Sequence, residues 1–350
     1  MSDPSLLARM ACRIVALALL VSAATARAQD LDQASDYQPG QDWHVPGTNI
    51  GVGGYGALSY ENQSNGHASV AIDEVSLLLH WENDGRVRLF GELSLESPLV
   101  YAPAAGQLTG QSYLALERLY GDFLYSERLN VRVGKFLTPI GRWNVIHADP
   151  LVWTTSRPLI TEQAFPTNTT GAMVFGVLPV FGHMVDYSVY GALGTEWRPN
   201  PNLDPFTEAY GAHLSTALSP DSDLGLSLVS FEQRSSVGER RKLLGLDYVW
   251  SRSRFEYTAE AAYRFSGNGS AFDEKGLFIQ GVMPLSERLY GVVRYEFYDP
   301  AGSAADINLC VLGIAYKASP ALVLKMELRH GGDRSPIAPD GVQASLAFLF

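Results

Sequence analysis

The residues of this sequence that could do chemistry are concentrated between Leu137 and Thr170. Five side chains of this stretch are charged or ionisable: Arg142, His147, Asp149, Arg157 and Glu162. With Ser156, two of them supply the residue types of a hydrolase, which needs a nucleophile, a base and an orienting carboxylate in mutual reach. No motif fixes that geometry, so a hydrolase is the weaker interpretation and we expect no catalytic residue. Charges of both signs on one segment are better suited to orienting ions and dipolar solutes.

The same stretch is too rich in aromatic and charged groups for a simple solvated loop. It also contains four prolines: Pro139, Pro150, Pro158 and Pro166. Each proline fixes its own φ and biases the preceding residue toward extended geometry, which stiffens the segment. Loops of this length are uncommon unless they are functional. Two interpretations remain open: the segment folds inward and narrows a pore, or it is an ordered loop on the surface or at a trimer contact.

The elements that must position this loop are strands. Between Leu322 and Arg329 apolar residues alternate with other residues, which are charged from Lys325 on, and the same alternation runs through 86–96 and 255–265. Successive strand side chains point to opposite faces, so each segment has one apolar and one polar face. A soluble β-sandwich could alternate in the same way. Composition alone therefore does not separate a sandwich from a membrane barrel.

Turn spacing favours the barrel. Short connections rich in turn residues fall at 83–85, 126–128, 179–183, 219–223, 251–254, 286–288 and 319–321. Longer polar connections alternate with them, at 61–67, 97–110, 137–170, 195–207, 233–241, 266–273, 299–306 and 331–339. Outer-membrane barrels alternate in this way because periplasmic turns are tight and extracellular loops are long. The pattern predicts an all-β protein, a transmembrane antiparallel up-and-down β-barrel of about 16 strands, with both termini periplasmic and a long third loop.

The first 28 residues have the pattern of a secretory signal peptide. Arg9 and Arg13 precede a short apolar run, which ends at Ala26-Arg27-Ala28. The run is too short to span a bilayer as a helix. We expect cleavage there, a short periplasmic N-terminal segment at 29–47, the barrel at 48–350, and export to the bacterial outer membrane.

The last strand carries a second pattern. Its alternating apolar face consists of Val342, Ala344, Leu346, Phe348 and Phe350. This face resembles the C-terminal strand of bacterial outer-membrane proteins, which their barrel-assembly machinery reads. Phe348 and Phe350 are therefore the expected assembly signal.

The charge balance and the sparse metal-ligand types exclude several function classes. The formal net charge is −11, with 26 Lys and Arg residues against 37 Asp and Glu residues. Nucleic-acid binding depends on clustered basic residues, so that partner is not expected. The histidines show no paired ligand spacing and no Gly-rich phosphate loop opens a helix, so we expect neither a metal nor a cofactor. After cleavage Cys310 would stand alone, which excludes an internal disulfide.

A family resemblance adds to these inferences. The stretches 133–142 (VGKFLTPIGR), 147–151 (HADPL) and 155–159 (TSRPL) look like the corresponding region of bacterial outer-membrane porins, particularly the phosphate-selective porin O/P-like group. The resemblance implies a homotrimeric passive channel in outer-membrane lipid, which admits small hydrophilic solutes or ions and is not an enzyme. In such porins the third loop narrows the lumen. The expected constriction residues here are Arg142, His147, Asp149, Arg157 and Glu162.

Strand parity predicts which charged residues line the lumen. The expected set is Arg86, Arg88, Glu92, Arg132, Arg264, Arg294, Glu296, Lys325, Glu327 and Arg329. Arg86, Arg88 and Arg132 are expected to face the constriction, although any of these charges could instead pair across strands. The wall is mixed in sign, so a phosphate-selective or anion-selective pore is the alternative to near neutrality or weak cation preference. Lys135 breaks the parity of its strand, which predicts a bulge or a side chain that extends to the rim.

Overall fold

The computed structural model of this protein describes residues 43–350. The exceptions are 65, 67, 84, 103–106, 110–111, 147, 202, 268–272, 303–304, 332–334 and 336, and at 107–109 and 193 only the backbone is described. The expected signal peptide and most of the expected N-terminal segment lie outside the described residues. So does His147.

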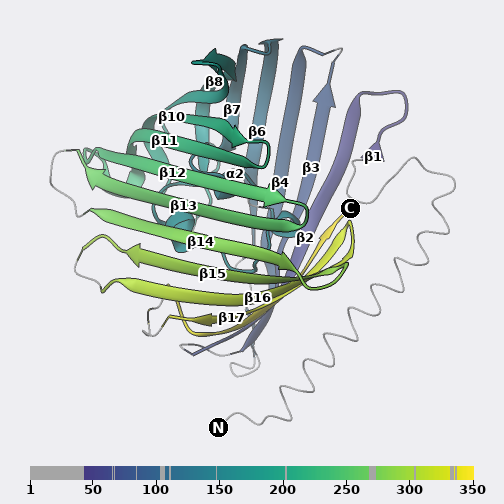
Figure 1. The fold of residues 1–350 in the computed structure, drawn as a ribbon. Coiled ribbons are helices and arrows are strands. Elements are labelled where there is room, and N and C mark those ends of the chain that lie inside the picture. The colour runs from purple at the N-terminus through teal and green to yellow at the C-terminus, as the bar shows by residue number, and fades with distance from the viewer. Residues whose placement is uncertain are drawn as a thin grey trace.

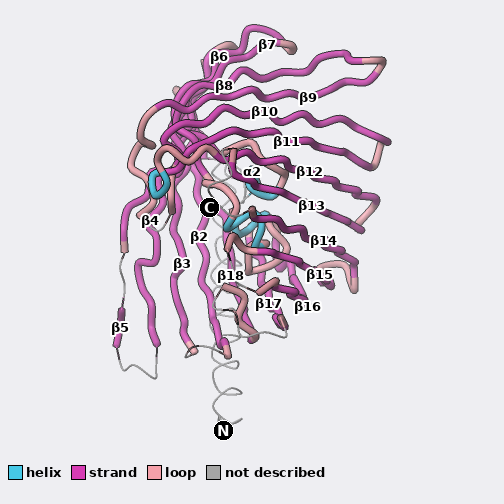
Figure 2. Tube along the Cα trace, turned by 90° about the vertical axis from the view of Figure 1, so that its left-hand side faces the viewer, coloured by secondary structure: helices cyan, strands magenta, loops and turns pink. Residues whose placement is uncertain are grey.

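The chain forms one closed antiparallel β-barrel (Figures 1 and 2). Of the eighteen strands described, sixteen are long: β2 (Ile50–Gln63), β3 (Ser69–Glu82), β4 (Val87–Ala102), β6 (Tyr113–Ser126), β7 (Leu129–Leu137), β8 (Asn168–Val180), β9 (His183–Leu193), β10 (Phe206–Ser219), β11 (Ser222–Gln233), β12 (Arg241–Arg252), β13 (Phe255–Ser266), β14 (Glu274–Pro284), β15 (Leu289–Asp299), β16 (Ile307–Ser319), β17 (Leu322–His330) and β18 (Gly341–Leu349). The short strands β1 (Trp43–His44) and β5 (Gln107–Thr109) pair with β2 and β4. Because β18 pairs with β2, the ring is closed. The predicted all-β antiparallel barrel of about 16 strands is confirmed.

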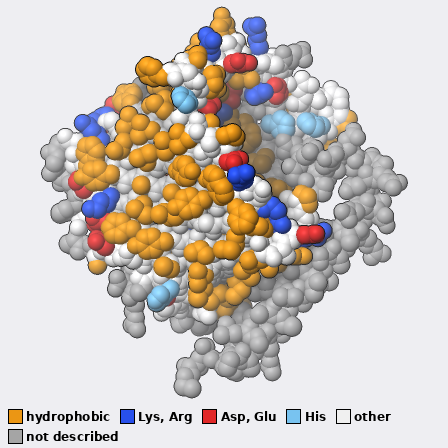
Figure 3. Space-filling model, in the orientation of Figure 1, with side chains coloured by type: hydrophobic (Ala, Val, Ile, Leu, Met, Phe, Trp, Pro, Cys, Tyr) orange, Lys and Arg blue, Asp and Glu red, His pale blue; other side chains and the backbone are white. Residues whose placement is uncertain are grey.

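Strand parity gives the wall an apolar outside. In β4, Leu89 and Leu93 are exposed on the outside of the ring. Glu92 and Ser94, which flank Leu93, are buried inside it. Figure 3 shows hydrophobic side chains spread over the face that is turned to the viewer. Closure pairs the backbone along the wall, so the apolar outside can face lipid without unpaired N–H or C=O groups.

β-Bulges change the parity of β3 and β6, the two strands that flank β4. The pairing of β2 with β3 skips Asp73, and the pairing of β4 with β6 skips Glu117. An extra residue shifts the alternation, so residues on both sides of the shift can point to the same face. Asp73 therefore points inward beside Glu74, and Glu117 points inward beside Arg118.

The ring closes where β18 meets the glycine-rich β2. Phe350 exchanges two backbone hydrogen bonds with Gly54, of 2.7 and 2.9 Å. The ring of Phe350 lies over Gly54 and the ring of Phe348 lies over Gly56, so closely that neither position has room for a Cβ atom. Glycine is required at these two sites because an aromatic ring approaches the strand backbone. Both phenylalanines thus help to build the seam, and their role as an assembly signal stays a prediction.

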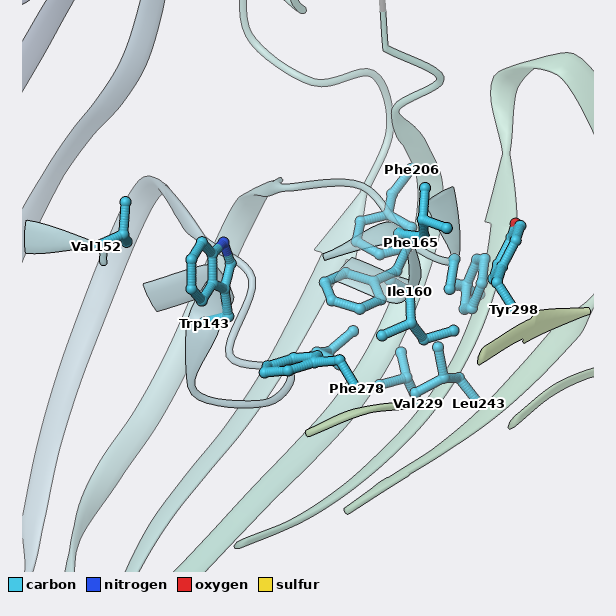
Figure 4. Close-up of a cluster of buried hydrophobic side chains, with 14 of the residues drawn as sticks. Trp143, Val152, Ile160, Phe165, Phe206, Val229, Leu243, Phe278 and Tyr298 are labelled. Carbon is cyan, nitrogen blue, oxygen red and sulfur yellow. The ribbon is translucent and has the colours of Figure 1, made fainter. Parts of the chain in front are cut away.

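The connection between β7 and β8, residues 138–167, lies inside the barrel and is called the inner loop below. It carries α2 (Trp143–Ile146), η3 (Asp149–Leu151) and α3 (Leu159–Gln163), and a further short turn, η4 (Arg234–Ser236), follows β11. Trp143, Ile160 and Phe165 of the inner loop share a buried cluster with Leu243 and Phe278 of the wall (Figure 4). The hydrophobic core therefore lies between the loop and one side of the barrel. Within the described ranges, no helix is long and apolar enough to cross a membrane.

Candidate functional site

Carboxylates of the wall hold the inner loop by its backbone. Glu260 of β13 accepts hydrogen bonds from the consecutive N–H groups of 142–143, at 2.8 and 2.6 Å. Glu327 of β17 accepts from the N–H groups of 155–156, at 2.9 and 3.1 Å. Glu296 of β15 accepts from the first N–H of α3 at 2.6 Å. Irregular backbone inside a protein needs such partners, because an unpaired buried N–H group is costly.

Cationic side chains of the same strands hold the loop carbonyls. Arg294 of β15 donates to the Thr154 hydroxyl at 2.5 Å, and to the carbonyl and hydroxyl of Ser156 at 3.0 and 2.6 Å. Lys325 of β17 donates to two loop carbonyls at 2.9 and 3.1 Å. Arg264 of β13 donates to a further loop carbonyl at 3.0 Å. The loop is therefore fastened along alternate strands of one wall.

These contacts change the role of half the residues expected to line the pore. The five that bond to the loop are all buried: Arg264, Arg294, Glu296, Lys325 and Glu327. They point inward, as parity predicts, but the loop covers them. Buried charges are stable only when they are paired or hydrogen-bonded, and the loop supplies the partners. We correct their assignment from pore lining to attachment of the loop.

A cavity of about 640 Å³ remains between the loop and the opposite wall, and is called the acidic cavity below. Its carboxylates come from the wall and from the loop: Glu61, Asp73, Glu74, Glu96, Glu117, Asp149 and Glu162. Arg157 of the loop and Arg329 of β17 are the basic residues among its lining. Three expected constriction residues, Asp149, Arg157 and Glu162, thus lie around one space. So does Arg329 of the expected wall set.

Sequence parity misses three of the wall carboxylates. Asp73 and Glu117 are turned inward by the bulges, whereas Glu61 belongs to β2, which extends two residues beyond it into a segment expected to be a loop. A signal for the bulge in β3 is present in the sequence. Outward apolar residues of a regular strand are two apart, but Ile72 and Val75 are three apart, and β6 shows the same spacing.

The four carboxylates of Asp73, Glu74, Glu96 and Glu117 lie on adjacent strands. Glu74 and Glu96 are direct cross-strand partners, an arrangement that destabilises a sheet when both are charged. Asp73 accepts a hydrogen bond from Ser59 at 2.6 Å. Across the described ranges, none of the four forms an ion pair with Lys or Arg.

Nearer the tight turns, the same wall carries paired charges. Glu92 forms an ion pair with Arg118 and accepts a hydrogen bond from the Tyr55 hydroxyl at 2.7 Å. Arg132 binds Asp122 with two hydrogen bonds of 2.7 and 2.8 Å. Arg132 also borders a second cavity, of about 260 Å³, together with residues of the inner loop. Glu92 and Asp122 are therefore neutralised by neighbouring arginines. The four carboxylates that β3, β4 and β6 bring to the acidic cavity have no such partner among the described residues.

The two arginines of the acidic cavity have few partners. Arg329 is 7% exposed, its Nε has no hydrogen-bond partner, and no hydrogen bond or ion pair joins it to another described residue. Arg157 donates one long hydrogen bond of 3.4 Å to Asn144, while its Nε is unpaired. Burial lowers the pKa of Arg157, and burial raises the pKa of Glu162 against the opposing effect of Arg157.

Other expected constriction residues lie elsewhere. The Arg142 side chain is half-exposed, 3.9 Å from Asp223, and borders a different cavity of about 220 Å³. Arg86 is exposed in the tight turn before β4, and Arg88 pairs with Glu82 at 3.1 Å with both side chains about half exposed. The expectation that Arg86 and Arg88 face the constriction is wrong, because they sit at the turn end of β4. His147 lies outside the described residues.

Lys135 does not mark a bulge. Its register partners are Leu119 in β6 and Thr170 in β8, and neither pairing inserts a residue there. The ammonium group extends to the loop between β9 and β10, where it pairs with Glu196 at 2.5 Å and donates to two neighbouring carbonyls at 3.2 and 3.3 Å. A long flexible stem lets the charge reach this loop.

Serine and histidine residues of the lumen are engaged in structural contacts. The hydroxyl of Ser156 accepts from Arg294, within the loop attachment. In the wall, Ser227 contacts His213 at 2.9 Å and His213 lies 3.8 Å from Asp247, yet both contacts use the same ring nitrogen, Nδ1. A hydrolytic triad needs the base to use its two nitrogens separately. Ser227 is also fully buried, and its hydroxyl accepts the N–H of Gly141.

The fold is that of outer-membrane porins. An anion-selective porin from Comamonas acidovorans is similar with a TM-score of 0.58 and 13% identity, over 87% of this chain and 100% of that one. A Salmonella typhi OmpF complex gives a TM-score of 0.61 at 10% identity, over 88% and 100%. The trimer form of OmpT from Vibrio cholerae gives 0.56 at 10% identity, over 86% and 99%. The architecture is therefore that of a bacterial outer-membrane protein, as predicted.

Sequence comparison is less specific. No protein-family model matches the chain. An uncharacterized protein of Aquifex aeolicus is 29% identical over 357 residues, covering 86% of this chain and 80% of that protein. The porin-like fold expected from the resemblance is confirmed, and the phosphate-selective group within it stays a prediction.

Proposed function

We propose that this protein is an outer-membrane channel through which small hydrophilic solutes and ions diffuse passively, and that the inner loop narrows it. One observation carries the proposal. The inner loop is bonded along β13, β15 and β17, and the acidic cavity remains between the loop and the opposite wall. A loop held on one side leaves a passage on the other.

The size of the barrel supports this proposal. Sixteen strands enclose more space than inward side chains fill, so a barrel of this size leaves a lumen. The apolar contacts of the loop fill one side of that lumen. The remaining passage is lined by charged and polar groups, which suit hydrophilic solutes and not apolar ones.

The constriction residues we propose are Asp149, Arg157 and Glu162 on the loop, with Glu74 and Glu117 on the facing wall. Local charge governs which ions enter a narrow passage. Because acidic residues outnumber basic ones around the cavity, we expect the channel to prefer cations. A phosphate-selective or anion-selective pore is the alternative, favoured by the sequence resemblance and not by this lining.

We further propose a homotrimer in outer-membrane lipid, exported by a signal peptide and inserted by the barrel-assembly machinery. The apolar outside of the wall supports contact with lipid, and a solved porin-like neighbour is described as a trimer. Both termini would be periplasmic, because the tight turns and both barrel ends would then share that side.

Reconstitution into planar bilayers tests the proposed function. We expect stepwise single-channel currents and, in a KCl gradient, a reversal potential that shows K⁺ preference. A protein that is folded by circular dichroism and inserted in the membrane but carries no current would overturn the channel. A current strongly blocked by phosphate would support the anion-selective alternative. Hydrolysis of lipid or peptide by the non-conducting protein would point to an enzyme.

A further inference from the structure

The acidic cavity combines two kinds of unsatisfied charge. On β3, β4 and β6, four carboxylates lie together without a basic partner in the part of the chain described. On β17 and the loop, the guanidinium groups of Arg329 and Arg157 each leave Nε unpaired. A ligand with groups of both signs would satisfy the two sets at once.

The carboxylate side fits a cationic group. The bulge at Asp73 brings a second carboxylate beside Glu74, and Glu96 lies directly across from Glu74 in the register. Like charges at such positions repel each other. An ammonium or guanidinium group placed among them would relieve this repulsion, and each carboxylate could accept a charge-assisted hydrogen bond from it.

The arginine side fits a carboxylate. Arg329 is more than nine-tenths buried and lines the cavity. No described residue supplies a bonded anion to this guanidinium, and leaving a buried guanidinium so is costly. Its planar donors match the two oxygens of a carboxylate. Arg157, which descends from the loop into the same space, adds a second cationic group with a free donor.

The spacing of these groups requires a ligand with separated charges. Arg329 on β17 and Asp73 on β3 are three strands apart along the wall, or about 14 Å of backbone at ordinary strand spacing. Side chains on both sides reach into the space between them. The cavity volume, about 640 Å³, is within the range of sites that hold small molecules.

We propose that the acidic cavity is a binding site for basic amino acids and short basic peptides. The carboxylate of the solute would contact Arg329 and Arg157, and its cationic end would lie among Asp73, Glu74, Glu96 and Glu117. This inference rests on the proposed function, because it names the solute class that the channel would select. Inorganic phosphate fits less well, since it has no cationic group to place among the four carboxylates.

Calorimetry on the detergent-solubilised full chain tests the inference without requiring a current. The probes are lysine, cadaverine, which is lysine without its carboxylate, glutamate and inorganic phosphate. We expect lysine to bind more tightly than cadaverine, and glutamate and phosphate to bind weakly. Equal binding of lysine and cadaverine, or tighter binding of glutamate or phosphate, would overturn the proposal.

Variants separate the two halves of the site. Glu74→Gln should weaken the binding of both lysine and cadaverine about tenfold, because each loses a charge-assisted contact. Arg329→Gln should weaken lysine binding by a similar factor and leave cadaverine binding unchanged or stronger. Arg329→Lys, which keeps the charge, should restore part of the lysine affinity. If Arg329→Gln changes lysine and cadaverine binding equally, no carboxylate site exists at Arg329.

Asp186→Asn is the matched control. Asp186 is exposed near the turn end of β9 and outside the cavity lining, and its substitution makes the same change in net charge as Glu74→Gln. It should leave all four affinities unchanged. Bilayer recordings on the same samples keep the two proposals distinct. Ionic current without lysine binding would contradict this inference alone. Lysine binding without ionic current would contradict the channel function.

Discussion

Two sides of one barrel wall carry similar inward charges with different roles. On β13, β15 and β17, Glu260, Arg294 and Glu327 are buried and bonded to the inner loop. On β3 and β6, Glu74 and Glu117 face the acidic cavity without a basic partner among the described residues. Carboxylates point inward on both sides, although Glu117 does so because of the bulge in β6. Whether a charge is bonded to the loop or faces the cavity depends on which side the loop covers.

The comparison also explains why paired and unpaired acids coexist on one wall. Glu92 and Asp122 have arginine partners, whereas Asp73, Glu74, Glu96 and Glu117 have no Lys or Arg ion-pair partner among the described residues. A regular strand turns every second residue inward, but a bulge adds one more without adding a partner on the next strand. The bulges therefore concentrate acid where the loop leaves the lumen open.

The largest effect should follow from releasing the loop. Glu260→Ala combined with Glu327→Ala removes the acceptors of four backbone N–H groups. We expect single-channel conductance to rise severalfold, and the free energy of unfolding to fall by about 1–3 kcal/mol for each unsatisfied site. Bilayer recordings and denaturant titrations measure the two effects. The Gln double variant, which keeps an oxygen acceptor at each site, is the control; unchanged conductance in the Ala variant would mean that the loop does not limit the pore.

Removing acidic side chains that border the acidic cavity should change the ion selectivity of the channel without changing its single-channel conductance. Glu74→Gln with Glu117→Gln deletes two charges that border the cavity. Each charge at about 6 Å from a passing ion in 0.1 M salt, after screening, raises the local K⁺ concentration and lowers the local Cl⁻ concentration by roughly twofold each. Removing two such charges should therefore lower the K⁺/Cl⁻ permeability ratio by about tenfold. Reversal potentials in a KCl gradient report this ratio. Asp186→Asn with Glu287→Gln removes the same total charge at two exposed positions outside the cavity lining, and an equal fall in that variant would remove the special role of the cavity.

Salt should produce a smaller effect on the unmodified protein. The Debye length shortens from about 10 Å at 0.1 M to about 3 Å at 1 M salt, so carboxylates act on ions over a shorter range. The cation preference should decline over this interval when reversal potentials are measured at a fixed concentration ratio. A preference that is independent of salt would indicate direct binding in place of screening-sensitive attraction.

The smallest effect is expected at the turn end of β4. Arg88 is about half exposed and pairs with Glu82, outside the acidic cavity. Arg88→Gln should leave conductance and selectivity unchanged and alter the free energy of unfolding by no more than about 1 kcal/mol, because exposed ion pairs contribute little. Bilayer recordings and denaturant titration of this variant check the corrected position of Arg88. A marked change in ion selectivity would mean that Arg88 lies at the constriction after all.

Part of the candidate site could be predicted from the sequence. The length and charge of the loop single out Asp149, Arg157 and Glu162, which all border the acidic cavity. Parity predicts that Arg329 faces inward. The three-residue spacing between Ile72 and Val75 also indicates the bulge in β3, although a prediction from strict alternation misses it.

Other parts could not be predicted because they depend on long-range contacts. Lys135 was expected to mark a bulge or to extend to the rim, but its partner Glu196, which belongs to a loop some sixty residues later, could not be named from the sequence. The attachment of the loop joins the N–H of Arg142 to Glu260, 118 residues away, and that of Thr155 to Glu327, 172 residues away. No local pattern encodes such a pair.

The strands, their two faces and the alternation of short and long connections can be read from the sequence, because side-chain direction in a strand and turn chemistry are local properties. The position of the loop against β13, β15 and β17 becomes known only from the folded barrel. The loop lies there because buried charges are stable only when they are paired or hydrogen-bonded, and these strands and the loop supply each other's partners. The carboxylates of β3, β4 and β6 are left to face the acidic cavity.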